Sequence, residues 1–147
     1  MLSLHIELGC TARFSAPQPE MQIRNHSLLI SAEAVVQRQL DAYNVRDLES
    51  FLATYAVDAE QHLLHAGIMA TGREAIRKRM VERFGDPALH AELISRTVMD
   101  QIVVDHELVT RTFPDGLATV EMICIYEVQS GNISKATFAI GQARPRI

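Results

Sequence analysis

The stretch that decides the fold is LATVEMICIYEV, residues 117–128, because it has a clear two-residue period. In a β-strand, successive side chains point to opposite faces. One face of this stretch is apolar or aromatic throughout: Ala118, Val120, Met122, Cys124, Tyr126 and Val128. The other face mixes polar and aliphatic side chains: Thr119, Glu121, Ile123 and Ile125. The pattern predicts a strand with one face on a core and one face exposed or covered by a partner.

Length and charge indicate a single domain that does not bind nucleic acid. The chain has 147 residues and a net charge of -4, from 14 Lys and Arg against 18 Asp and Glu. A domain of this size buries roughly two-thirds of its surface on folding, so it can form a core without a metal or a disulfide. Its basic residues are scattered apart from Arg77-Lys78-Arg79, a run typical of a solvated helix face.

The cysteines and the apolar segments favour a reduced, cytoplasmic protein. Cys10 and Cys124 lie far apart and lack the spacing of a metal site, so we expect Cys124 to be a buried thiol. We expect no membrane interaction, because no apolar run is long enough to cross a bilayer. An alternating run near the start has no preceding basic residue and predicts an edge strand or an irregular extension rather than an export signal: Leu2, Leu4, Ile6 and Leu8.

Capping and turn signals divide the remaining chain into helices followed by strands. Ser31 and Asp47 are candidate N-caps of two helices, and Thr71 with Glu74 forms a candidate capping box for a third. Turn signals separate the expected strands: 59–64, 91–99, 102–113, 117–128 and 132–140. We therefore predict an α+β domain over 27–141, preceded by a partly irregular extension (1–26) and followed by a tail (142–147).

This order of elements resembles the NTF2-like superfamily, which includes SnoaL-like cyclases and ketosteroid isomerases. The segments that carry the resemblance are Val35-Val36-Gln37-Arg38, Asn44-Val45-Arg46-Asp47-Leu48, Tyr55-Ala56-Val57-Asp58-Ala59, Gly72-Arg73-Glu74-Ala75-Ile76, and Ile125-Tyr126-Glu127-Val128 followed by Gly131-Asn132-Ile133. The resemblance implies an NTF2-like (cystatin-like) cone, in which three N-terminal helices pack on a curved, mostly antiparallel sheet around an apolar pocket. It also implies a homodimer, which the aliphatic outer face of 117–128 favours: Thr119, Glu121, Ile123 and Ile125.

Together with the strand faces, the resemblance implies a pocket for a small, largely apolar molecule. The expected lining residues are Gln39, Tyr43, Tyr55, Leu63, Arg96, Met122, Cys124, Tyr126 and Phe138. Ketosteroid isomerases use a carboxylate base and an oxyanion hole formed by a tyrosine and a protonated acid. Matching the motifs places Gln39 at the tyrosine, Leu63 at the base and Cys124 at the acid. None of the three groups is retained, so we do not expect steroid isomerisation by that mechanism.

Two histidines are the catalytic candidates. His106 shares a predicted strand face with aliphatic residues, so we expect it to face the core as a general acid or base, with a hydrogen-bonded core histidine as the alternative. His65 is the second candidate. On a strand, His62 and His65 would point to opposite faces, so we expect no metal site. Asp105 and Glu107 are then outer charges, although the reversed register would make them the acids of the pocket.

The sequence leaves two functions open. In the first, the protein is a cofactor-free enzyme of the isomerase, dehydratase or cyclase kind, with His106 as acid or base. In the second, it is a non-catalytic module that binds a small ligand or a protein. Loss of the isomerase carboxylates favours the second function, and a histidine in the pocket favours the first.

Overall fold

The computed structural model describes residues 30–146, in which three helices and a seven-stranded sheet form the α+β arrangement that the sequence predicts. In chain order the elements are α2 (Ala32–Val45), α3 (Leu48–Ala53), β1 (Tyr55–Leu63), β2 (Gly67–Thr71), α4 (Arg73–Phe84), β3 (His90–Met99), β4 (Ile102–Phe113), β5 (Gly116–Gln129), β6 (Asn132–Ile140) and β7 (Arg144–Pro145). The predicted extension at 1–26 lies outside the described residues. Within them, no helix has both the length and the apolar character needed to span a bilayer.

Two of the three expected helix caps are confirmed. The side chain of Ser31 accepts a hydrogen bond from the Ala34 amide at the start of α2, and Asp47 accepts one from the Ser50 amide at the start of α3. The predicted capping box of the third helix is wrong: α4 begins after Gly72, which makes no side-chain cap. Thr71 is instead the last residue of β2, where it pairs with Glu60 of β1 and stays extended.

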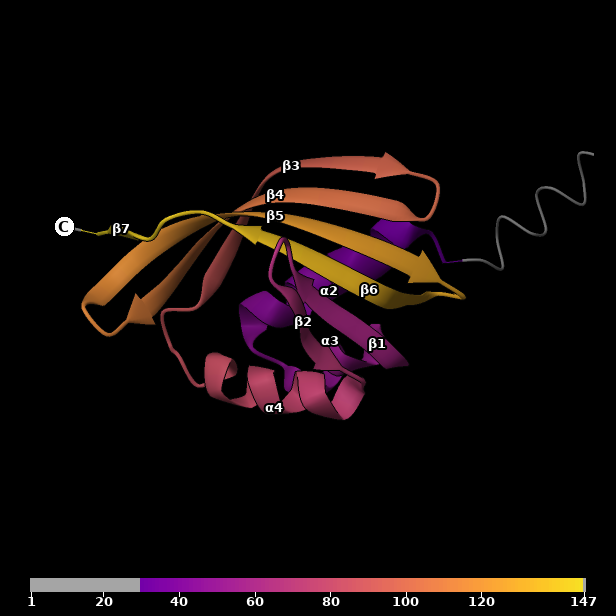
Figure 1. The fold of residues 1–147 in the computed structure, drawn as a ribbon, viewed down its shortest axis with the longest axis horizontal. Helices are drawn as coiled ribbons and strands as arrows, with labels where there is room; N and C mark the ends of the chain where they lie inside the picture. Colours follow the sequence, from indigo (N-terminus) through magenta and orange to yellow (C-terminus); the bar gives the residue numbers. More distant parts are fainter. Residues whose placement is uncertain (1–29, 147) are drawn as a thin grey trace, which may run out of the picture.

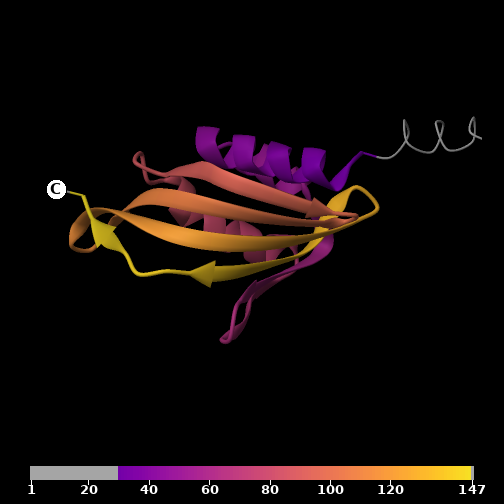
Figure 2. The same cartoon turned by 90° about the horizontal axis from the view of Figure 1, so that it is seen from above.

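The strands form one curved, mixed sheet in the order β2-β1-β6-β5-β4-β3, with β7 paired to β5. The pair β1–β6 is parallel, and the other neighbouring pairs are antiparallel. Strands β3 to β6 arch over α4 (Figure 1), and α2 lies along the sheet on the side of β3 (Figure 2). Helix α2 contacts β3 to β6, while α4 contacts β1, β2 and α3. The helices therefore close the concave side of the sheet.

The two faces of β5 are as the period predicts. Cys124, Tyr126 and Val128 are almost fully buried on the inner face, and Cys124 is a free thiol. On the opposite face, Glu121 and Ile123 are exposed. This strand therefore sets the inside and the outside of the sheet.

The faces of β4 are the reverse of the expected ones. Asp105 lies opposite Cys124 and Glu107 opposite Met122, and directly opposed residues of an antiparallel pair share a face. Both acids are buried, with 0% of Asp105 and 5% of Glu107 exposed. The aliphatic residues that favoured the other register are only partly buried on the outer face: Ile102, Val104 and Leu108.

Arg96 compensates the buried charge of Asp105. A β-bulge between Leu93 and Ser95 shifts the alternation of β3, so that Arg96 lies opposite Asp105 on the inner face. Its Nε and Nη2 atoms donate to the two oxygens of Asp105 at 2.7 and 2.9 Å, and its Nη1 atom donates to Gln37 of α2 at 2.8 Å. This pair ties β3 and β4 to the helix layer.

Candidate functional site

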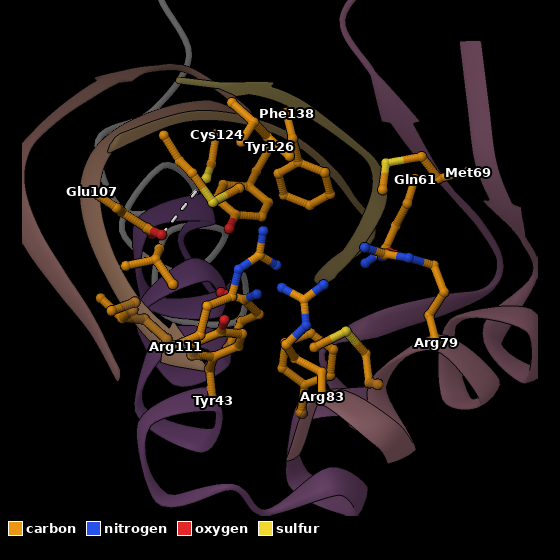
Figure 3. A pocket seen from close by; sticks show the side chains of 18 of the residues that line it. Tyr43, Gln61, Met69, Arg79, Arg83, Glu107, Arg111, Cys124, Tyr126 and Phe138 are labelled. Carbon is orange, nitrogen blue, oxygen red and sulfur yellow. Dashed lines mark hydrogen bonds between the residues drawn. The ribbon is translucent and has the colours of Figure 1, made fainter. Parts of the chain in front are cut away.

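A cavity of about 130 Å³ lies between the inner face of the sheet and the helices. Figure 3 shows its side chains converging from β4, β5 and β6 and from α2 and α4. Most of the residues predicted to line a pocket lie along its wall: Gln39, Tyr43, Tyr55, Met122, Cys124, Tyr126 and Phe138. The structure thus brings these residues together, and their contact with a ligand stays a prediction.

Leu63 and Arg96 lie elsewhere. Leu63 is the last residue of β1, beside the turn to β2, and Gln61 lines the cavity two residues earlier. Arg96 is held by Asp105 and Gln37 and is absent from the cavity wall, so its expected role as a pocket residue is wrong.

The expected positions of both catalytic histidines are also wrong. His106 lies on the outer face of the sheet, where its imidazole contacts the carboxylate of Glu121 on β5. His65 is an exposed turn residue between β1 and β2, with a φ of 66°. Neither imidazole reaches the cavity, because the register of β4 turns His106 outward and the end of β1 leaves His65 in the turn.

Glu107 is the acid of the cavity. Its Oε2 atom accepts a long hydrogen bond from the Cys124 thiol at 3.6 Å, the dashed line of Figure 3, and its buried Oε1 atom has no partner among the described residues. Burial, and then the nearby charge of Asp105, raise the pKa of Glu107 to about 7. Near neutral pH this carboxyl group can therefore both accept and donate a proton.

Three tyrosines surround the cavity as neutral hydroxyl groups. Burial raises the pKa of Tyr43 to about 12, although the Arg83 guanidinium beside it opposes the rise. Burial also raises the pKa of Tyr55 and of Tyr126 well above the usual value. The hydroxyl of Tyr55 is held by the side-chain amides of Gln39 at 3.5 Å and Gln61 at 3.3 Å. These groups remain protonated at neutral pH and can donate hydrogen bonds.

Arginines form the opening of the cavity. Arg79 and Arg83 lie one turn apart on α4, and Arg111 lies on β4. Figure 3 shows the guanidinium groups of Arg83 and Arg111 pointing into the cavity and that of Arg79 beside Gln61. The same three arginines also line a groove of about 670 Å³ on the surface, between the end of α4 and the end of β4. They therefore lie between the cavity and the groove.

Sequence reasoning missed the charged residues of the site. The sequence predicts Glu107 as a pocket residue only under the reversed register of β4, and it includes Arg79 in a run typical of a solvated helix face. A usable signal existed for Arg79 and Arg83, because their spacing of four residues places both on one helix face with Met80 beside them. Among residues 30–146, no group of three or more His, Cys, Asp or Glu side chains could hold a metal ion.

Comparison with known proteins identifies the family. The family model of the SnoaL-like domain matches residues 36–136, which is more than half of the chain. The chain belongs to the SnoaL-like domain family. No curated protein matches the sequence at a significant level.

Solved structures share the fold of this SnoaL-like domain. An uncharacterised cystatin-fold protein from Novosphingobium aromaticivorans is 21% identical with a TM-score of 0.68, over 74% of this chain and 97% of that one. A proposed ketosteroid isomerase from Kribbella flavida is 20% identical with a TM-score of 0.64, over 79% and 82% of the two chains. A proposed polyketide cyclase from Sinorhizobium meliloti is 21% identical with a TM-score of 0.59, over 71% and 92%. At these identities the likeness of the SnoaL-like domain to them concerns the fold alone.

Proposed function

We propose that the cavity is the active site of a cofactor-free enzyme of the isomerase, dehydratase or cyclase kind, in which Glu107 transfers the proton. The observation that carries the proposal is Glu107, a residue of the cavity wall with a buried Oε1 atom that has no partner among the described residues, and with a pKa of about 7 that suits proton transfer near neutral pH. A carboxyl group kept near neutrality by burial is a recurring feature of acid–base enzymes.

The chemistry that this arrangement can perform needs only one proton. The ionised Glu107 carboxylate takes a proton from a carbon atom next to a substrate carbonyl group. The neutral hydroxyl of Tyr126, which lines the same cavity, is the group we assign to hydrogen-bond the enolate oxygen that forms. The protonated Glu107 then returns the proton to the same or another substrate atom, so isomerisation needs no further reactant.

The walls suit a small carbon skeleton. Apolar residues of the sheet and the helices line the cavity together with Glu107: Phe51, Met69, Met80, Val109, Met122 and Phe138. A cavity of about 130 Å³ is of the size that holds a single six-membered ring in other proteins, and is smaller than most ligand pockets. The group that reacts beside Glu107 is therefore small.

Deuterium exchange tests the proposal without knowledge of the natural substrate. The protein is incubated in D2O with a panel of small ketones and oxo acids, and deuterium incorporation next to the carbonyl group is followed by mass spectrometry. We expect the wild-type protein to accelerate exchange on at least one compound, with a rate that rises as pH increases through about 7, because Glu107 must be ionised to act as the base.

The matched variants decide the role of Glu107. Glu107→Gln keeps the shape of the side chain and should reduce the exchange rate by about 100-fold or more, the usual range for loss of a general base. His106→Gln, on the outer face of the same strand, should keep the wild-type rate. Equal rates in Glu107→Gln and wild type, or no exchange on any compound, would overturn the proposal. Binding of a panel member without exchange would favour a non-catalytic module.

A further inference from the structure

Three arginines at the cavity opening have no acidic partner among residues 30–146, in contrast to Arg77 and Arg96. Arg77, on the outer side of α4, forms ion pairs with Glu49 and Glu74, and Arg96 pairs with Asp105. Within residues 30–146, by contrast, none of Arg79, Arg83 and Arg111 forms an ion pair with a carboxylate.

All three arginines are partly buried, which adds to the cost of having no counter-ion. The Nε atom of Arg111 is buried without a hydrogen-bond partner among the described residues, and its guanidinium carbon lies 4.5 Å from the ring centre of Phe113. Burial and the charge of Arg83 lower the pKa of Arg79, as expected for like charges held together. Unpaired charges removed from water destabilise a fold, so such a cluster is typical of a binding site for the opposite charge.

The position of the arginines relates them to the cavity. All three line both the cavity that contains Glu107 and the outer groove. Two acidic residues also lie along the groove, but Glu82 is exposed, and Asp86 already accepts hydrogen bonds from the Ala88 amide and from the amide and hydroxyl of Thr112. The opening between cavity and groove therefore keeps an excess of positive charge.

We propose that Arg79, Arg83 and Arg111 bind an anionic oxygen group of the substrate, a carboxylate or a phosphate, at the opening between cavity and groove. The planar guanidinium group donates parallel hydrogen bonds that match such groups. The inference rests on the proposed function, because it assigns the substrate of the same site. An anion site at the arginines explains how a cavity of about 130 Å³ can bind part of a larger molecule. The reacting part lies beside Glu107, and the charged part lies at the arginines and extends into the groove.

The test measures binding of defined anions by calorimetry and by thermal stabilisation. The probes are benzoate, whose ring matches the size of the cavity, benzyl alcohol as its uncharged counterpart, and inorganic phosphate. We expect the wild-type protein to bind benzoate or phosphate, with an affinity that falls as salt is added, and to bind benzyl alcohol at least about tenfold more weakly than the better anion. The stronger of the two anions identifies the group as a carboxylate or a phosphate.

Charge-matched variants then locate the site. Arg83→Gln and Arg111→Gln should each weaken anion binding by about tenfold or more, the range for loss of one charged hydrogen-bonding partner. Lys78→Gln removes the same charge from an exposed position of α4 and should leave the affinity unchanged. If Arg111→Gln fails to fold, Arg111→Lys and Arg83→Gln supply the comparison.

The outcomes also separate this inference from the proposed function. Anion binding that is absent in the wild type, or equal in the wild type and both arginine variants, would overturn the inference even if deuterium exchange depends on Glu107. Anion binding that depends on the arginines, with exchange that does not depend on Glu107, would overturn the proposed function alone.

Discussion

At the scale of single residues, the unusual feature is a carboxyl group buried where its charged form is disfavoured. Glu107 is 5% exposed, and the described residues offer its Oε1 atom no hydrogen-bond donor. Asp105, two residues away on the same face, adds a negative charge, while Arg96 lowers the pKa of Glu107 only in part. The native protein therefore holds the proton of Glu107 more tightly than the unfolded chain does.

This difference predicts a pH dependence of stability. The pKa of Glu107 is about 7 in the folded protein and 4.5 in the reference state, so between these pH values the folded state binds more protons. The free energy of unfolding should fall as pH rises from 4.5 to 7, by roughly 3 kcal/mol from this group, and should then level off. Urea unfolding at a series of pH values measures the change.

The variant Glu107→Gln isolates the contribution of this residue. It lacks the titrating group, so its stability should vary less than that of the wild type between pH 4.5 and 7. Parallel pH profiles of the two proteins would show that the pKa of Glu107 is not raised.

At the scale of elements, the ion pair of Arg96 and Asp105 links two strands to a helix. The side chain of Asp105 is fully buried, that of Arg96 is 9% exposed, and Arg96 also reaches Gln37 on α2. Loss of one partner from a buried pair leaves the other charge uncompensated, which is more costly than replacement of the whole pair.

We therefore expect Asp105→Ala to destabilise the protein by about 3 to 5 kcal/mol, measured by urea unfolding at pH 7. The double variant Arg96→Met with Asp105→Leu, which removes both charges, should recover much of this loss. A single variant as stable as the wild type would mean that Arg96 finds another partner.

Most elements could be predicted from the sequence, because capping residues, turn residues and strand periods are local signals. The inner face of β5 followed from its apolar alternation. The faces of β4 could not be predicted in the same way. The hydrophobicity of Ile102, Val104 and Leu108 favours their face as the inner one, although the two acids of β4 lie on the inner face in the structure. The fold tolerates both acids inside. Arg96 compensates the charge of Asp105, and burial raises the pKa of Glu107 to about 7, so that its charge is partly lost at neutral pH. Neither compensation is visible within the strand itself.

At the scale of the whole molecule, the convex face of the sheet carries aliphatic side chains next to charged ones. Ile123 is 36% exposed and Leu117 40%, and the His106–Glu121 pair lies beside Ile123. We propose, as the sequence predicted, that a second copy of the chain covers this face around Thr119, Glu121, Ile123 and Ile125. An aliphatic patch of this kind is typical of a protein interface.

Sedimentation velocity at micromolar concentration tests the homodimer. The wild type should sediment as a dimer, and Ile123→Glu should shift it towards the monomer, because it places a further acidic side chain on the face that carries Glu121. Val57→Glu changes another aliphatic residue that is 74% exposed, on β1, and should remain dimeric. A monomeric wild type would contradict the prediction.

The site could be predicted less completely than the fold. The resemblance to NTF2-like proteins placed Gln39, Tyr43, Tyr126 and other residues around a common cavity, because such positions follow from the arrangement of the elements. The charged residues depend on contacts between elements far apart in the chain. Arg83 and Arg111 meet only because the last turn of α4 reaches the end of β4.

The bulge in β3 accommodates one residue more than a regular strand would need between Leu93 and Arg96. Residues on either side of Ile94 alternate in opposite phase, so Leu93 and Arg96, three residues apart, both point inward. Ile94 is the extra residue of the bulge, so a chain without it would form a regular ladder in which Leu93 and Arg96, then two residues apart, still point inward. When other SnoaL-like sequences are aligned with this one, a gap at Ile94 is therefore the loss of the bulge alone, and it should leave the pairing of positions 96 and 105 intact.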